Sequence, residues 1–369
     1  MKKIMGLLLT TLLVMSLFVG CGSKEKDAEP TGGNDSNQSS SEKDQGNKGD
    51  NSADKPKVGV TIYKFDDNFM TYTRNAMTSA AEGNAELVMN DSQNNQSVQN
   101  DQVDVMINKG VKALVINLVD PGAAPTIADK AKAADIPLIF VNKEYPEGTD
   151  KIDYDKVWYV GTQSKESGDI QGKLVAEAWK AHPEWDRNGD GVMQYVMLMG
   201  EPGHPDAEAR TKYSVEYIKD EGIRVEELEK QTGMWDATKG KELMTTWLGK
   251  EGDKIEMVLC NNDGMALGVV EALKADGYFS DGKYMPVVGV DAIPEALDLI
   301  QQDIMLGTVL NDPLNQGRVS IEMAINSAAG KDVLDGLDFS LDETKAVRIP
   351  YQPITKDNLD LAKKAYGME

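Results

Sequence analysis

From Lys57 onward, short apolar runs alternate with longer amphipathic segments. The apolar runs predict buried strands at 58–63, 86–89, 113–116, 137–141, 157–160, 194–199, 223–227, 255–260, 286–290 and 307–310. The amphipathic segments, such as 96–108, 165–180 and 265–274, predict helices between these strands. This alternation is typical of βαβ units, which build parallel sheets.

The predicted strands are too numerous for one compact sheet. About five of them precede residue 162 and about five follow it. We therefore expect an α/β fold with two similar, Rossmann-like lobes, each built on a parallel sheet. Several strands are apolar almost throughout, which is typical of sheets that helices cover on both faces.

Polar side chains follow many of these strands at the point where each strand ends. Ligands of open α/β sheets bind beyond the carboxyl ends of the strands. The residues found there are Asp67, Asn142, His204, Asp206, Asn262, Asp291 and Asn311. The same position is occupied by Asn90, Asn117 and Asp120, which need not touch a ligand, because such loops are rich in Asn and Asp in any α/β protein.

The first 56 residues have no such alternation. Lys2 and Lys3 precede an apolar stretch at 4–20, which ends in the small residue Gly20 and is followed directly by Cys21. This pattern is that of a secretory signal peptide, and its end resembles the lipobox of bacterial lipoproteins, although Phe18 stands where Leu is usual. We predict a signal peptide at 1–20 and lipidation of Cys21; a plain signal peptide cut elsewhere is the alternative.

Residues 22–56 contain no Val, Leu, Ile, Met or aromatic side chain. Such a segment cannot bury enough surface to offset its chain entropy, so we predict that 21–56 is a disordered tether. Cys260 is the second of two cysteines and lies in an apolar run. A small buried hydrophobic residue is the favoured interpretation there, ahead of a nucleophile.

The charge of the chain narrows the classes of function. The chain has 369 residues and a formal net charge of -22. Nucleic-acid binding needs a basic surface, and electrostatic docking on anionic lipid needs a basic segment. We therefore expect no nucleic acid as a partner, and contact with the membrane only through the lipid anchor.

Several motifs resemble the periplasmic galactose/glucose-binding protein family. The clearest are VGVTIYKFDDNFM at 58–70 and GEPGHPDAEAR at 200–210. Further matches are MNDSQN at 89–94, INLVDP at 116–121, GVDAIPEA at 289–296 and GTVLND at 307–312. They keep their order from about residue 57 to the C-terminus.

The resemblance implies a periplasmic binding protein of type I, in which three chain segments form a hinge between two lobes that close on a sugar. Carried onto this chain, the N-terminal lobe is 57–162 plus 312–348, and the C-terminal lobe is 163–311 plus 349–369. It also implies a monomer that delivers galactose or glucose to the permease of an ABC transporter. A chemotaxis receptor is a further partner in the family.

The resemblance also assigns the sugar contacts. The polar contacts are Asp67, Asn142, His204, Asp206, Arg210, Asn262, Asp291 and Asn311. Phe69 and Trp235 would stack on the two faces of the pyranose ring. By residue chemistry alone, Phe69 would more often be a core residue, Trp235 would be a core or packing residue with roughly even odds, and His204 could equally be a helix-start residue. Asp206 and Arg210 could equally be a surface ion pair four residues apart.

The segment 186–194 has the D-x-N-x-D-G core of a calcium loop. Asp186, Asn188, Asp190, the Val192 carbonyl and Gln194 occupy the positions that supply oxygen ligands. Met197 stands where an ordinary EF-hand has Glu, and an Asp/Asn/Gly surface turn is the alternative. The resemblance implies that Glu256, from a distant strand, completes a site for calcium.

We therefore expect an extracytoplasmic, lipid-anchored solute-binding protein and not an enzyme. A glycosidase would use Asp67, Asp206 or Asp291 as acid and base, but nothing marks one carboxylate as a nucleophile. A sugar-sensing repressor would need a basic helix-turn-helix in place of residues 1–56. Binding of another pyranose, or a role as the ligand-binding component of a chemoreceptor, remain alternatives.

Overall fold

The computed structural model describes residues 55–145 and 152–368 of the protein. These residues belong to one compact unit, Ser52–Glu369. The predicted signal peptide, Cys21 and all but the last two residues of the predicted tether lie outside the described residues. Within the described ranges, no helix is long and apolar enough to cross a membrane.

The first sheet has six strands, all of them parallel, in the order β11-β5-β4-β3-β1-β2. Its strands are β1 (Lys57–Ile62), β2 (Glu86–Asp91), β3 (Ala113–Ile116), β4 (Leu138–Val141), β5 (Val157–Gly161) and β11 (Ala346–Arg348). Five of them coincide with strands predicted from the sequence. β11 was not predicted because three residues are too few to show a periodic pattern.

Alternation along the strands gives this sheet two buried faces. On one face, Val58, Val60 and Ile62 pack against α1 (Asn68–Ala81) and α9 (Pro313–Ala328). On the other, Leu114 and Ile116 pack against α2 (Gln96–Asn108) and α3 (Ala124–Ala133). Burial on both faces explains why these strands are apolar almost throughout.

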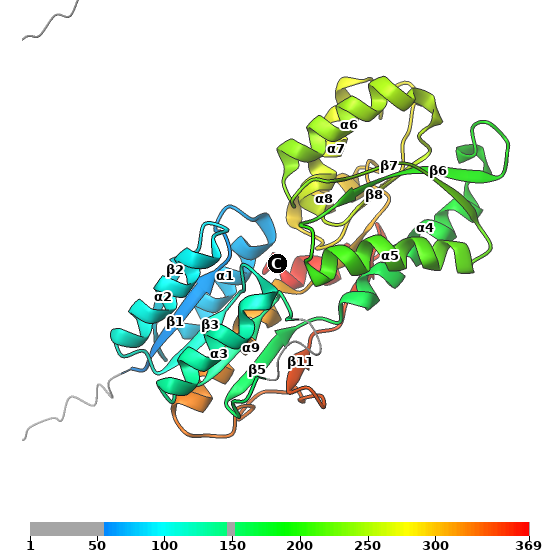
Figure 1. Ribbon diagram of the computed structural model, residues 1–369. Helices are drawn as coiled ribbons and strands as arrows, with labels where there is room; N and C mark the ends of the chain where they lie inside the picture. The colour runs from blue at the N-terminus through cyan, green and yellow to red at the C-terminus, as the bar shows by residue number, and fades with distance from the viewer. Residues whose placement is uncertain (1–54, 146–151, 369) are drawn as a thin grey trace, which may run out of the picture. The chain divides into compact units, whose positions relative to one another are not determined.

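The second sheet has four parallel strands in the order β7-β6-β8-β9. They are β6 (Val192–Met199), β7 (Arg224–Thr232), β8 (Met257–Cys260) and β9 (Val287–Val288). Figure 1 shows helices on both faces, with α4 (Ser164–Ala181) and α5 (Pro205–Asp220) on one, and α6 (Ala237–Glu251) and α7 (Asp263–Ala275) on the other. The apolar clusters agree, because Met193 and Met197 pack with α4 and α5, whereas Val196 and Leu198 pack with α6 and α7.

One predicted strand does not belong to a parallel sheet. β10 (Thr308–Leu310) pairs in antiparallel fashion with β12 (Gln352–Ile354), a strand that the sequence did not predict. The reason is topological: after β11 the chain returns from the first sheet and runs back alongside β10. The remaining helices are α8 (Pro294–Gln301) and α10 (Leu359–Ala365). The chain passes between the two α/β lobes three times, after β5, after β10 and after β11.

Candidate functional site

The loops at the carboxyl ends of the strands form one polar cleft. All ten residues that the resemblance assigned to sugar binding line it, together with Tyr63 and Met70. About 340 Å³ of the cleft is not filled by protein atoms. The lining residues come from segments as far apart as β1 and β10, so parallel-sheet topology, which places strand ends at the same edge, brings them together.

Asp67 lies in the loop between β1 and α1, where its carboxylate is fixed by the start of the helix. Its Oδ1 accepts a hydrogen bond from the Met70 amide at 2.7 Å, which makes Asp67 the N-cap of α1. Its Oδ2 accepts from the Tyr63 hydroxyl at 2.6 Å. Phe69 is both a core residue and a cleft residue, because its ring contacts the apolar cluster of the first lobe and lines the cleft.

Asn142 and Asn311 are linked through a helix residue. The Gln316 side chain on α9 donates to Asn311 Oδ1 at 2.5 Å. Asn142 Nδ2 lies 3.5 Å from Gln316 Oε1, and Asn142 Oδ1 accepts from Asn117. Asn142 has a backbone φ of 64°, an uncommon conformation for a residue other than glycine, and such strain gathers at functional sites. Asn117, which was predicted to lie at a strand end, thus supports the cleft by holding the Asn142 side chain.

His204 is the N-cap of α5 and faces the cleft as well. Its Nδ1 accepts from the Asp206 amide at 3.1 Å, so Nδ1 carries no proton and the ring's hydrogen is on Nε2. Burial lowers the pKa of His204 well below its usual range, and the positive charges of Lys143 and Arg210 act in the same direction. The neutral imidazole therefore offers one N–H donor to a ligand.

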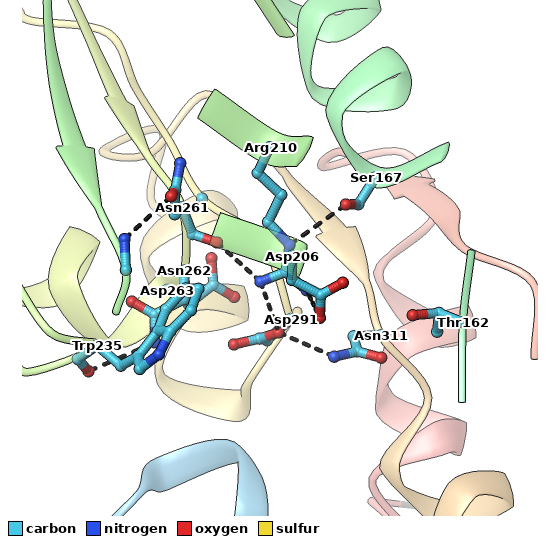
Figure 2. A network of polar contacts seen from close by, with 12 residues as sticks. Thr162, Ser167, Asp206, Arg210, Trp235, Asn261, Asn262, Asp263, Asp291 and Asn311 are labelled. Carbon is cyan, nitrogen blue, oxygen red and sulfur yellow. Dashed lines mark hydrogen bonds and ion pairs between the residues drawn. The ribbon is translucent and has the colours of Figure 1, made fainter. Parts of the chain in front are cut away.

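Arg210 is the centre of the polar network in the second lobe. Its guanidinium donates to the Asn261 carbonyl at 2.9 Å, the Ser167 hydroxyl at 3.2 Å and the Tyr351 hydroxyl at 2.9 Å. It also pairs with Asp206 at 3.3 Å. Figure 2 shows the side chain pointing from α5 toward Asp291, with Ser167 and Asn261 beside it. The fork of donors is thereby held in one orientation.

The helical pair of Asp206 and Arg210 is buried and not a surface ion pair, since the exposed fractions of the two side chains are 6% and 3%. Burial acts to lower the pKa of Arg210. The Tyr351 oxygen and the carboxylates of Asp206 and Asp291 outweigh it and raise that pKa. The surface-pair interpretation is therefore wrong for this chain.

Asp291 has an unusual electrostatic environment. Its Oδ1 accepts from the Asn311 amide at 3.2 Å and lies 3.8 Å from Arg210. Burial nevertheless raises its pKa to about 7, against the opposing effects of Arg210 and Asn311. A second carboxyl, that of Asp263, is fully buried nearby, and its pKa is raised by burial and then by Asp291.

Two aromatic rings, those of Phe69 and Trp235, line the cleft. Trp235 is half-buried in the loop between β7 and α6 and makes an edge contact with His204, with ring centroids 5.1 Å apart. Its indole lies directly against Gly200, where a Cβ would overlap the ring. Asn262, the N-cap of α7, holds the Trp235 carbonyl at 3.5 Å. The ring is therefore packed against the Gly200 backbone, while Asn262 contacts the main chain of Trp235.

Some residues of this site carry no recognisable signal in the sequence. Tyr63 and Met70 line the cleft but lie within the apolar pattern of β1 and α1, which gave no signal of exposure. Tyr351 is in the returning segment after β11, and its hydroxyl joins Arg210 to the Thr162 hydroxyl at 2.9 Å. Only the tertiary fold brings a residue so far along the chain to Arg210.

The predicted calcium loop lies at the start of β6, where Asp186 and Asp190 bind backbone amides of the loop itself. The Glu256 side chain reaches this loop from the segment before β8 and is only 1% exposed; its carboxylate accepts from the Arg187 and Gln194 amides. Burial raises the pKa of Glu256, and these two amides oppose it. The distant carboxylate and the loop are thus brought together.

The donor set of this loop fits a hard cation. Gln194 Oε1 is buried without a hydrogen-bond partner. The Asn188 and Gln194 amides both donate to Asp190 Oδ2, and turning each about its last side-chain bond would present two oxygens instead. No three His, Cys, Asp or Glu side chains in the described ranges are grouped closely enough to hold a metal by themselves. Amide and carbonyl oxygens would have to complete the shell, as calcium permits.

A larger cavity, with about 1400 Å³ not filled by protein atoms, lies elsewhere, around Trp185 and Tyr284. Its charged side chains are largely exposed, and they do not form the buried, mutually hydrogen-bonded set found around Arg210. Specific ligand sites combine a concave surface with a few precisely held polar groups. The polar cleft, although smaller, is therefore the candidate functional site.

The fold and the cleft place this chain in a class of proteins that hold a solute between two α/β lobes. Residues 58–332 match the family described as periplasmic binding protein domain. The chain belongs to this family.

The chain is similar to several binding proteins. A D-galactose/methyl-galactoside binding periplasmic protein of Haemophilus influenzae is 52% identical over 306 residues, which are 82% of this chain and 90% of the relative. A ribose import binding protein of Bacillus subtilis is 28% identical over 277 residues, which are 75% of this chain and 83% of the relative. An ABC transporter solute-binding protein of Bacillus halodurans, solved with bound myo-inositol, is 29% identical with a TM-score of 0.71; 85% of this chain covers 98% of it.

These relatives and the shared fold are those of binding proteins, so the chain is a solute-binding protein and not an enzyme. The predicted fold class is confirmed: an α/β protein with two parallel-sheet lobes of the type I periplasmic binding protein kind. The family is extracytoplasmic.

Proposed function

We propose that this protein captures D-galactose or D-glucose outside the cytoplasm and delivers it to an ABC transporter. The observation that carries the proposal is the cleft itself, in which the ten residues assigned by the family resemblance meet although they derive from distant segments. Sugar hydroxyls both donate and accept hydrogen bonds. The cleft offers Arg210 and His204 as donors, carboxylates as acceptors, and amides that do both.

The Haemophilus influenzae relative, a D-galactose/methyl-galactoside binding protein, supports galactose among the possible sugars. Phe69 and Trp235 supply apolar faces on which the C–H patches of a pyranose can stack. Isothermal titration of the purified protein with D-galactose, D-glucose, D-ribose and myo-inositol tests the proposal. Galactose or glucose should bind most tightly and remain chemically unchanged. Tighter binding of ribose or myo-inositol, or sugar consumption in proportion to protein concentration, would contradict it.

The proposal includes calcium at the loop 186–194. Asp186, Asn188, Asp190, Gln194 and the Val192 carbonyl would hold the ion, with Glu256 as the distant carboxylate. The support is the approach of Glu256 to the loop and the buried, unpartnered Gln194 oxygen. A bound calcium ion would supply positive charge that offsets the loop's carboxylates, and it would stabilise the second lobe without reaching the sugar.

The proposal also includes a lipid anchor at Cys21, with 21–56 as a tether that holds a monomeric binding domain at the outer face of the cell membrane. Its support is the sequence pattern of residues 1–21. A contact with a chemotaxis receptor stays a prediction that rests on the family resemblance. The lobe limits 57–162 plus 312–348 and 163–311 plus 349–369 are likewise proposed as the units that move against each other.

A further inference from the structure

Lys143 is a buried lysine outside the set of residues that line the cleft. It follows Asn142 after β4, in the first lobe, and its side chain is only 1% exposed. Its ammonium group donates to the Val119 carbonyl at 2.8 Å and lies 4.7 Å from the centre of the Tyr63 ring. Burial lowers the pKa of Lys143, and Glu201 opposes this effect.

The counter-ion of Lys143 comes from the other lobe. Glu201 lies in the loop after β6, and its Oε2 accepts from the Lys143 ammonium at 2.8 Å. Its Oε1 lies 3.4 Å from the Asn94 amide, which also belongs to the first lobe. Glu201 is thus held from two places on the first lobe, and its side chain is 18% exposed. Neither Lys143 nor Glu201 lines the cleft.

An ion pair between two lobes exists only while the lobes are together. When they separate, Lys143 loses its carboxylate partner and is hydrated instead. Removing one member of a buried, hydrogen-bonded pair leaves the other charge uncompensated, and in interfaces this mainly accelerates dissociation. Tyr63 connects the pair to the cleft, because its ring faces Lys143 while its hydroxyl donates to Asp67.

We propose that the Lys143–Glu201 ion pair is a latch that holds the two lobes closed and slows the release of sugar, without touching the sugar itself. This inference rests on the proposed function, in which the sugar is held between the lobes. Lys143 and Glu201 are accordingly positioning residues, and their effect should fall on the dissociation rate and not on the choice of sugar.

The test compares Glu201→Gln with wild type by stopped-flow kinetics and titration with D-galactose and D-glucose. Glu201→Gln keeps the shape of the side chain and leaves Lys143 without a counter-ion. We expect the dissociation rate to rise about 30-fold or more, as for other buried charge pairs that lose one partner, with the galactose-to-glucose ratio nearly unchanged. Glu216→Gln, which removes a half-exposed ion pair with Lys212 on α5, is the matched control and should behave as wild type.

A double-mutant cycle identifies the pair as the cause. Lys143→Met with Glu201→Gln removes both charges, so the combined loss of affinity should be smaller than the sum of the two single losses. Circular dichroism checks that Lys143→Met folds; if it does not, Glu201→Gln alone decides. Wild-type dissociation rates in Glu201→Gln overturn the latch.

A second measurement separates failure of the latch from failure of the proposed function. If no sugar of the panel binds to wild type, the proposed function fails, but X-ray scattering of the sugar-free proteins still tests the latch. The ion pair predicts a larger radius of gyration for Glu201→Gln than for wild type. Equal radii in that case would show that the pair does not hold the lobes together.

Discussion

Replacing Asp291 with an asparagine tests the electrostatics of the cleft through the stability of the sugar-free protein. The pKa of Asp291 is raised from 3.8 to about 7 in the folded state, chiefly by burial. The carboxyl group therefore binds a proton more tightly in the folded chain than in the unfolded chain. Its contribution to stability is complete at pH values below the unfolded pKa, and it is lost as the pH rises through about 7.

The size of the effect follows from the two pKa values. Each pKa unit corresponds to about 1.4 kcal/mol, so lowering the pH from 8 to 5 should stabilise wild type by about 2 to 3 kcal/mol through this group. An amide side chain does not titrate in this range, so the Asp291→Asn variant lacks this gain. The fully buried Asp263 adds to the difference in the same direction, because the charge of Asp291 also raises its pKa.

The measurement is urea unfolding of wild type and Asp291→Asn at pH 5, 6, 7 and 8. Comparing the two proteins at each pH cancels the contributions that titratable groups far from Asp291 make to the pH dependence of stability. Asp360→Asn is the control, because the Asp360 side chain is 97% exposed and should produce no pH-dependent difference. If the stabilities of wild type and Asp291→Asn change in parallel from pH 8 to pH 5, burial does not dominate at Asp291 and the reasoning is refuted.

Three further predictions concern the aromatic rings, the calcium loop and the anchor. Trp235→Ala and Phe69→Ala should each weaken galactose binding in calorimetry while circular dichroism stays native, since an aromatic contact contributes about 0.5–1.5 kcal/mol beyond its buried area; unchanged affinity in both would place the sugar elsewhere. Calcium at ~100 times its Kd should add about 2.7 kcal/mol of stability. EDTA should therefore lower the melting temperature of wild type but hardly that of Glu256→Gln. If the melting temperature of wild type is the same before and after verified metal removal, the loop is only a turn. Cys21→Ser should move the protein from the membrane fraction to the soluble fraction, and retention in the membrane fraction would contradict lipidation there.

Much of the fold could be predicted because its strands are buried on both faces and its helices are amphipathic. The segment 96–108 is α2 to the residue, and β1 and β3 agree with their apolar runs to within one residue. The fold was less predictable where strands are short. β11 and β12 have three residues each, and their pairing depends on where the chain returns from the first lobe and not on local composition.

The candidate site was likewise predictable from the sequence only in part. Strand-end position alone located Asp67, His204, Asp291 and most of their polar neighbours, because loops at the carboxyl ends of parallel strands must meet at one edge. The family resemblance was needed for Arg210, Phe69 and Trp235. Tyr351 could not be found in this way. Its hydroxyl binds Arg210 only because the third crossing between the lobes passes beside α5.

The sequence by itself determined the class of fold, the residues at the strand ends and the acidic loop at 186–194, because periodicity and turn chemistry act over short distances along the chain. Tertiary structure alone decided which groups are buried together. A lysine such as Lys143 normally lies on the surface, and nothing near it in sequence indicates that Glu201, 58 residues away, will become its counter-ion. Burial and charge pairing depend on distances through space, and these exist only once the two lobes have been folded from separate segments.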